Sequence, residues 1–192
     1  MNTIYHLRIE LMEISPPIWR EVRVPADFRL DQLHTLIQIV MGWEDGHLHE
    51  FEVPGDDPMS DPPRFAPMHT LDDLFSDGVE DEAKASLGEL FSKIEDRLVY
   101  TYDFGDDWRH EIRLLDIQTA KSPDNPPRCL GGERAGPPED CGGLPGYEHF
   151  LKVLSDPGHE EFEELKDWIG GEFDPETFDL GAMEKGMRKA FG

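Results

Sequence analysis

The chain has 192 residues, of which 38% are apolar and 10% aromatic, and its formal net charge at pH 7 is −24. The apolar and aromatic share excludes an intrinsically disordered acidic tail, and the length suits one domain with a hydrophobic core. The excess of acidic residues argues against a nucleic-acid-binding surface, which needs a stripe of Lys and Arg.

The first residues are typical of a strand and not of an export signal. MNTIYHLRIELMEI alternates apolar and polar side chains, and no stretch of the chain approaches the length of a membrane span. Two cysteines without an export signal are typical of a reducing compartment. We therefore expect a cytoplasmic protein with neither a disulfide framework nor a membrane-spanning segment.

The N-terminal half of the sequence predicts a hairpin, a helix and a third strand. Apolar residues alternate over 5–11 and again over 18–24, which indicates two antiparallel strands. LDQLHTLIQIVMGW then places its apolar residues at helical spacing, and Gly42 marks the C-terminal end of this helix. HLHEFEV follows as a short strand, and the proline-rich residues 54–68 predict a loop.

Two further helical segments and the clearest hairpin of the sequence come next. Thr70 and Asp73 resemble a capping box, and the apolar spacing over 87–94 predicts an amphipathic helix. RLVYTYDFGDDWRHEIRLLDI then predicts two strands joined by a Gly-Asp-Asp turn. We expect one face of the first strand to carry Tyr100, Tyr102 and Phe104, and one face of the second to carry Trp108, His110, Ile112 and Leu114.

A long loop and three helices complete the chain. Residues 121–146 contain six Pro, six Gly and both cysteines, and loops of this length are usually functional or disordered. Apolar spacing predicts helices around 147–154, 162–169 and 180–187. The order ββαβαββααα predicts an α+β fold with a mixed, largely antiparallel sheet of about five strands, in a single domain over 1–192.

Two histidines and the two cysteines suggest a zinc site. His47 and His49 lie on the same face of a predicted strand, because side chains alternate with a period of two. Cys129 and Cys141 lie in the Gly/Pro loop, which could fold both thiolates onto one ion to complete a tetrahedral Cys2His2 set. In the alternative interpretation, the histidines are ordinary polar residues and the cysteines are unpaired in a loop held by its glycines.

Aromatic and acidic residues around the long loop suggest a binding surface. We expect this surface to consist of Trp43, Tyr102, Asp103, Asp106, Asp107, Trp108, His110, Glu139 and Asp140. Acidic residues are also concentrated in 155–179, which carry ten Asp or Glu and one Lys. Such charge suits a basic protein partner, a small ligand or a cation, whereas in the alternative interpretation it serves only solubility.

Motifs of the common enzyme classes are absent or lack their context. Asp-Phe-Gly at 103–105 resembles the magnesium-binding motif of kinases, but the sequence has no Gly-rich phosphate loop or His-Arg-Asp catalytic loop, so a hairpin turn is favoured. H-E-x-x-H, G-x-S-x-G, G-x-G-x-x-G and P-loop motifs are also missing from the sequence. Zincins, serine hydrolases with a nucleophile elbow and the common nucleotide-binding folds are therefore excluded.

Five blocks of the sequence resemble the Ri-plasmid Orf-three-like domain family, which includes an insertion-sequence passenger protein labelled TnpR-like. In chain order they are PPIWREVRVP, LHTLIQIVMGWEDGHLHEFEV, YTYDFGDDWRHEIRL, RAGPPEDCGGLPGYEHFL and WIGGEFDPETFD, and the resemblance extends from about Tyr5 to Met187. It implies a compact α+β domain associated with mobile elements and no particular reaction. Family members often carry another Cys just before PPED, where this chain has Gly136, so this chain has one potential metal ligand fewer.

Two functions remain open from the sequence. The first is a non-enzymatic binding or accessory module associated with mobile elements, and it is favoured because no recognisable nucleophile or acid–base pair is present. The second is a zinc-dependent enzyme with His47, His49, Cys129 and Cys141 at its centre.

Overall fold

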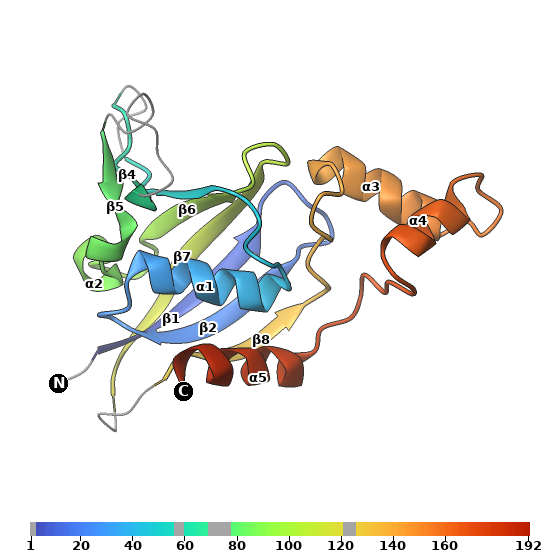
Figure 1. The fold of residues 1–192 in the computed structure, drawn as a ribbon. Helices are drawn as coiled ribbons and strands as arrows, with labels where there is room; N and C mark the ends of the chain where they lie inside the picture. Colours follow the sequence, from blue (N-terminus) through green and yellow to red (C-terminus); the bar gives the residue numbers. More distant parts are fainter. Residues whose placement is uncertain (1–2, 56–59, 69–77, 121–125) are drawn as a thin grey trace.

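The computed structural model describes residues 3–55, 60–68, 78–120 and 126–192. Figure 1 shows the elements, and their bounds follow in chain order. They are β1 (Thr3–Leu11), β2 (Trp19–Pro25), α1 (Leu30–Met41), β3 (His49–Glu52), β4 (Arg64–Ala66), β5 (Val79–Asp81), the short 3-10 helix η2 (Glu82–Lys84), α2 (Leu87–Leu90), β6 (Arg97–Tyr102), β7 (Trp108–Thr119), β8 (Arg128–Glu133), α3 (Gly143–Leu154), α4 (Phe162–Trp168) and α5 (Leu180–Phe191).

The strands of the described residues form one sheet in the order β5-β4-β3-β6-β7-β1-β2-β8. β4 and β5 are parallel, and the other neighbouring strands are antiparallel. The predicted α+β fold with a mixed, largely antiparallel sheet is therefore confirmed. The expected strand number of about five is corrected to eight, because β4, β5 and β8 were not predicted.

One face of the sheet carries the core, and the helices α1 and α5 lie against it (Figure 1). The inward residues of β1 and β2 are buried in the alternating pattern that the sequence predicted. The expected apolar residues of α1 are buried as well, and Gly42 ends this helix with a φ of +85°. Burial of these two apolar faces against each other supplies the main driving force for folding.

The hairpin of β6 and β7 is confirmed except at its tip. Trp108, His110, Ile112 and Leu114 are buried, as are Tyr100 and Tyr102. Phe104 is instead 51% exposed, because β6 ends at Tyr102 and Asp103 turns the chain with a φ of +56°. The expected face of three aromatic residues on β6 is thus corrected to two.

The segment 121–146 is not a structureless loop, which corrects a second expectation. Within it, β8 pairs with β2 at one edge of the sheet, and α3 begins at Gly143. The buried side chain of Arg20 fastens this edge, since it donates hydrogen bonds from Nε to the Val40 carbonyl at 2.7 Å and from Nη1 to the Glu133 carbonyl at 2.9 Å. Burial lowers the pKa of Arg20 to about 10, so its side chain remains charged at neutral pH.

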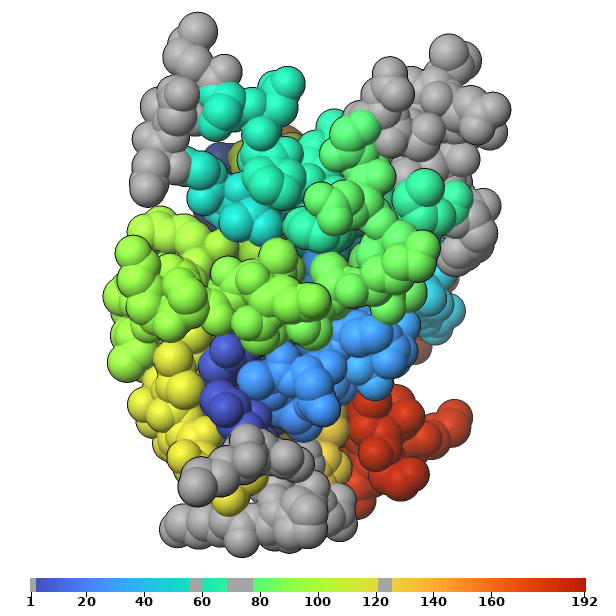
Figure 2. Space-filling model, turned by 90° about the vertical axis from the view of Figure 1, so that its left-hand side faces the viewer, coloured from blue at the N-terminus to red at the C-terminus, as the bar shows by residue number. Residues whose placement is uncertain are grey.

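The smaller elements at the other edge of the sheet are shorter than expected. Helix α2 covers only Leu87–Leu90, and Ile94, which was expected on its apolar face, is 49% exposed. Figure 2 shows this part of the chain (green) beside α1 (blue), and it also shows α5 (red) reaching α1 at the C-terminus. The capping box expected at Thr70 and Asp73 lies outside the described residues.

The last three helices occur where the sequence predicted them, but they are not equally buried. α3 buries Tyr147, Phe150 and Val153, whereas α4 has no buried residue. α3 and α4 project from one end of the sheet, and α5 returns to the sheet beside β8 (Figure 1). No helix in the described ranges is both long and apolar enough to cross a membrane.

Candidate functional site

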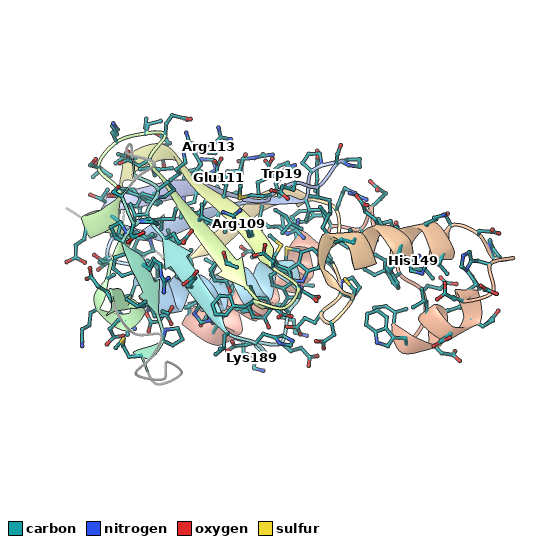
Figure 3. All side chains as sticks on the ribbon, turned by 90° about the horizontal axis from the view of Figure 1, so that it is seen from above. Trp19, Arg109, Glu111, Arg113, His149 and Lys189 are labelled. Carbon is teal, nitrogen blue, oxygen red and sulfur yellow. The ribbon has the colours of Figure 1, made fainter. Side chains whose placement is uncertain are left out.

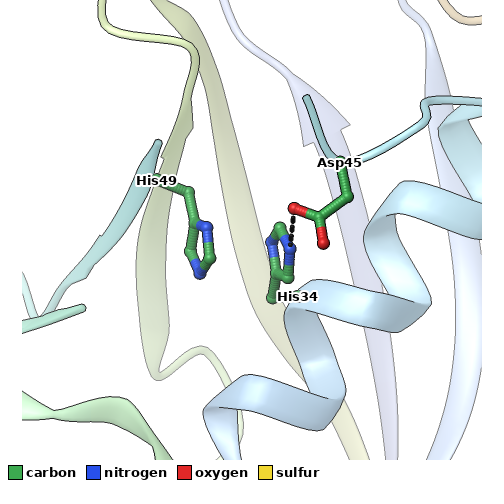
Figure 4. A group of neighbouring side chains, drawn as sticks. All are labelled: His34, Asp45 and His49. Atoms are coloured by element: carbon green, nitrogen blue, oxygen red, sulfur yellow. Dashed lines mark hydrogen bonds and ion pairs between the residues drawn. The ribbon is translucent and has the colours of Figure 1, made fainter. Parts of the chain in front are cut away.

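Two histidines and two carboxylates meet between α1 and the sheet. His34 lies on the inward face of α1, Asp45 in the segment that follows Gly42, His49 at the start of β3, and Glu82 in η2. The side chains of His34, His49 and Glu82 are almost fully buried, whereas that of Asp45 is 61% exposed. Figure 4 shows the two imidazole rings side by side with Asp45 at their edge. We call these four residues the histidine cluster.

A chain of hydrogen bonds fixes the protonation of His34. The Asp45 backbone N–H donates to Gln38 Oε1 at 2.9 Å, which orients the amide so that Gln38 Nε2 donates to the Tyr100 hydroxyl at 3.1 Å. The Tyr100 O–H is then left to donate to His34 Nδ1 at 2.8 Å. His34 therefore carries its proton on Nε2 and donates it to Asp45 Oδ1 at 2.9 Å.

The environment of these groups favours their neutral forms. Burial lowers the pKa of His34, with the neighbouring His49 acting in the same direction and Asp45 opposing. Burial also raises the pKa of Tyr100 well above its ordinary value, so the phenol keeps its proton. A neutral imidazole at His34 and a protonated phenol at Tyr100 are what the hydrogen-bond chain requires.

His49 has a different partner on its ring. Its Nε2 lies 2.8 Å from Glu82 Oε2, and both side chains are 6% exposed. Donation from Nε2 to this carboxylate leaves Nδ1 with a free lone pair and without a hydrogen-bond partner among the described residues. The rings of His34 and His49 are stacked, with centroids 3.5 Å apart and planes 4° from parallel.

The histidine cluster opens into a hollow of about 620 Å³. This volume lies within the usual range of small-ligand sites, on the order of 300–1,000 Å³. One nitrogen of His34, one oxygen of Asp45 and one nitrogen of His49 lie within 4.8 Å of one another, so they would be close enough to share an ion once one of the stacked rings turns. Besides the histidine cluster, the residues that line the hollow are Asp31, Thr35, Gly46, His47, Leu48 and Pro67.

The four metal ligands predicted from the sequence lie in separate places. His49 belongs to the histidine cluster, whereas His47 precedes β3 and faces Asp103 and Asp140. Cys129 is buried on β8, and Cys141 lies just before α3. Among the described residues, neither group of potential ligands within 4.8 Å contains a cysteine, so the expected set of His47, His49, Cys129 and Cys141 is not brought together.

The environments of the two thiols differ from those of metal ligands. Burial raises the pKa of Cys129, and burial together with Asp106 raises that of Cys141 to about 12. A metal ligand or nucleophile needs the thiolate, which both environments disfavour. Both sulfurs are free thiols in the structure.

The expected binding surface divides into a buried and an exposed part. Trp43, Tyr102, Trp108 and His110 are buried, so the expectation that these rings form an exposed surface is corrected. They pack against one another, and the loop after β8 is hydrogen-bonded to Trp43 and Tyr102. The acidic members of the set lie in that loop and in the turn between β6 and β7. Asp103 is buried, Asp106 and Glu139 are half-buried, and Asp107 and Asp140 are exposed.

The loop 136–142 is a structured cover over these rings. Trp43 Nε1 donates to the Pro137 carbonyl at 2.8 Å, and the Tyr102 hydroxyl donates to the Glu139 carboxylate. Glu139 also accepts a hydrogen bond from the Glu44 backbone N–H at 3.0 Å. The carboxylate of Glu139 therefore helps to hold the loop in place.

The same loop is tied to the turn between β6 and β7. Asp106 Oδ2 accepts from the Gly142 backbone N–H at 3.1 Å. His47 Nε2 lies 3.1 Å from Asp140, and its Nδ1 lies 3.6 Å from Asp103, which forms a second group of potential metal ligands. Gly142 has a φ of +89°, as expected for a glycine in a shaped turn.

The family of the chain is shown by its sequence. The model of the family described as plasmid pRiA4b ORF-3-like protein matches residues 3–182. The chain belongs to the plasmid pRiA4b ORF-3-like family. A relative in this comparison is the uncharacterized protein y4hQ of Sinorhizobium fredii, which is 32% identical over 190 residues, covering 96% of this chain and 91% of the relative.

A solved structure shares the fold of this plasmid pRiA4b ORF-3-like chain. It is the crystal structure of the protein of unknown function MM3350 from Methanosarcina mazei Go1. The two are 40% identical, with a TM-score of 0.82, and the likeness covers 94% of this chain and 97% of that one. These comparisons confirm the resemblance seen in the five sequence blocks and name no ligand or reaction.

Sequence reasoning missed three members of the histidine cluster: His34, Asp45 and Glu82. His34 follows Leu30 by four residues and precedes Gln38 by four, so helical periodicity alone places it on the buried face of α1. A histidine on a buried helix face needs a polar partner, so the helical periodicity was the sequence signal that could have predicted a buried polar site at His34. Glu82 gave no comparable signal, because it reaches His49 from a three-residue helix 33 positions away.

Proposed function

We propose that the protein is a binding module for a divalent transition-metal ion, held by His34, Asp45 and His49. The observation that carries this proposal is the histidine cluster itself, in which three ligand atoms from three segments lie within 4.8 Å beside a hollow. Binding of the ion, rather than a reaction at the ion, is the role proposed, in keeping with the favoured interpretation of the sequence.

The groups behind the two imidazoles support this role. Histidines that bind metals almost always donate their other ring N–H to a carboxylate or another polar group, which orients the ring. Glu82 is in that position for His49, with Nδ1 left as the ligand atom. For His34, Nε2 would be the ligand atom, and Tyr100 O would accept from Nδ1 after the proton moves from one ring nitrogen to the other.

The type of donor favours zinc or a similar ion over calcium or magnesium. Two neutral imidazoles and a carboxylate suit zinc, iron, cobalt or nickel, whereas calcium and magnesium prefer oxygen ligands. Parallel rings do not point their lone pairs at one point, so one ring has to turn when the ion binds. The side chain of Asp45 is 61% exposed, so it has room to move with the ring that turns.

Titration of metal-free protein with Zn²⁺ by calorimetry tests this proposal, with protein purified without an affinity tag. We expect one ion per chain. Asp45→Asn removes a ligand charge and Glu82→Gln removes the carboxylate that orients His49, so each should weaken binding about 10- to 100-fold. Circular dichroism of each variant verifies that it is folded.

Three matched variants serve as controls for the same titration. Cys129→Ser, Cys141→Ser and His149→Asn change potential ligands outside the histidine cluster and should leave the affinity unchanged. Binding that is sub-stoichiometric, or that is lost in the cysteine variants and retained in Asp45→Asn, would overturn the assignment.

An association with mobile elements stays a prediction, supported by the plasmid in the family's description.

A further inference from the structure

The segment 43–47 carries Asp45 to the histidine cluster, and its main chain needs outside support to do so. Asp45 has a φ of +60°, a left-handed conformation that residues other than glycine seldom adopt, although Asp adopts it more readily than most. Its side chain is 61% exposed, so packing does not hold it in place. A residue in such a conformation persists where the groups around it hold its main chain.

One pair of side chains holds the main chain on both sides of Asp45. The Glu44 N–H donates to Glu139 Oε2 at 3.0 Å, and the Gly46 N–H donates to the Tyr102 hydroxyl at 2.9 Å. The Tyr102 hydroxyl in turn donates to the other carboxylate oxygen of Glu139. The carboxylate and the hydroxyl therefore form a bridge between the two main-chain N–H groups that flank that of Asp45.

The chemistry of this bridge suits a rigid support. Tyr102 is fully buried and Glu139 is half-buried. Burial and the neighbouring Glu139 both raise the pKa of Tyr102, so the phenol keeps the proton that it donates. A carboxylate accepts at both oxygens, and hydrogen bonds to a carboxylate are stronger than those between neutral groups. An amide in place of Glu139 would present an NH2 group to one of the two donors.

The loop after β8 also holds the two ends of the same segment. Trp43 Nε1 donates to the Pro137 carbonyl at 2.8 Å, and His47 Nε2 lies 3.1 Å from Asp140 Oδ1. The side chain of Asp45 reaches the histidine cluster from between these two contacts (Figure 4). The position of this proposed ligand is thus set by a loop far away in the sequence.

We propose that Glu139 is a positioning residue of the histidine cluster, which acts through Tyr102 and the main chain to hold Asp45 beside His34. Glu139 does not itself line the hollow, so its effect on a bound ion is exerted through Asp45. The Asp45 side chain can still turn, because only its main chain is held. This inference rests on the function proposed above and adds the group that sets the place of one ligand.

Calorimetric titration of the metal-free full chain with Zn²⁺ tests the proposal. Glu139→Gln removes one of the two acceptors and should weaken binding about tenfold. Tyr102→Phe removes the hydroxyl of the bridge and should have the same effect, which gives a second variant if the first does not fold. In the Asp45→Asn background, Glu139→Gln should change the affinity by less than about twofold, because the residue through which it acts has already lost its ligand charge.

A purely structural role of Glu139 predicts other results in the same titrations. The variant would then be less stable to urea and would bind Zn²⁺ as the parent does. It could also lose the same factor of affinity in the parent and in the Asp45→Asn background. Either result would overturn the proposal.

A measurement without metal separates this inference from the proposed function. His34 Nε2–H donates to Asp45, so its proton NMR signal reports whether Asp45 is in place. In Glu139→Gln and in Tyr102→Phe this proton should exchange with water at least about tenfold faster than in the parent. If the parent binds no Zn²⁺, the proposed function fails, and this signal still decides whether Glu139 positions Asp45. Unchanged exchange in both variants would contradict the positioning role.

Glu133→Gln is the matched control, because it makes the same chemical change at the end of β8. The Glu133 carboxylate accepts from Trp19 Nε1 at 3.0 Å, and Trp19 projects from the face of the sheet away from Lys189 of α5 (Figure 3). This variant should bind Zn²⁺ and protect the His34 proton as the parent does. An equal loss of affinity in Glu133→Gln and Glu139→Gln would show that the effect is not specific to Glu139 and would overturn the assignment.

Discussion

Tyr100 lies at the centre of the buried hydrogen-bond chain between Gln38 and His34. Its hydroxyl accepts from Gln38 Nε2 and donates to His34 Nδ1, so two buried groups depend on a single oxygen atom. A buried polar group that loses its partner costs about 1–3 kcal/mol. The arrangement explains how an imidazole is held neutral and oriented in a core that is otherwise apolar and aromatic.

Tyr100→Phe is expected to lower the free energy of unfolding by about 1–3 kcal/mol, because the ring is kept and only the hydroxyl is lost. Urea denaturation measures the change. Tyr147→Phe is the matched control, since its hydroxyl is buried without a hydrogen-bond partner in the described residues. The control should be as stable as the parent or more stable, and equal losses in both variants would contradict the role assigned to Tyr100.

At the scale of elements, length and periodicity decided what the sequence could predict. β1, β2, α1, β6 and β7 each have at least six residues and an apolar pattern, and all five were predicted. β4 and β5 have three residues each, and β8 contains two glycines, so their pairing depends on neighbouring strands. The histidine cluster was predicted in part for the same reason, since His49 lies on a patterned strand and Glu82 on a three-residue helix.

Loop 136–142 is sensitive to a single added carbon atom. A Cβ at Gly136 would overlap the main-chain carbonyl oxygen of Met41, which cannot shift because it belongs to the last turn of α1. Gly136→Ala should therefore displace the loop and lower the free energy of unfolding by about 1–3 kcal/mol. The emission of Trp43 should also change, because its Nε1 donates to Pro137.

Gly131→Ala is the control for the loop variant, because a Cβ at that position meets no atom within 4 Å. Its stability should stay within about 0.5 kcal/mol of the parent. If Gly136→Ala behaves in the same way, the loop does not need to pack against α1.

For the whole molecule, the distribution of charge and burial links these features. The acidic residues concentrate in the loops and in 155–179, whereas arginines and acidic residues are interspersed on the sheet face opposite to α1 and α5. Between these surfaces, the core holds neutral histidines among aromatic rings, with His110 in contact with Trp43 and Tyr100. The folded protein therefore carries most of its charge on the surface, and protonation of its buried histidines lowers its stability at acidic pH.

His110 makes the global stability depend on pH in a defined direction. Burial lowers the pKa of His110 from 6.5 to about 4, and its Nε2 has no hydrogen-bond partner in the described residues. Between these two pH values the unfolded chain binds a proton that the folded chain does not, so stability falls as pH falls from 6.5 to 4. Above pH 7 both states are neutral at this residue and its contribution vanishes.

A pKa lowered from 6.5 to about 4 corresponds to about 3 kcal/mol of stability lost by pH 4. His110→Gln removes this titration, so the difference in unfolding free energy between pH 7 and pH 4 should be smaller in the variant by about that amount. Urea denaturation at several pH values measures the slope of the unfolding free energy against pH in the parent and in the variant. His149→Gln, at a half-exposed position on α3, should keep the slope of the parent. Equal slopes in the parent and in His110→Gln would mean that His110 does not make the stability of the fold sensitive to acid.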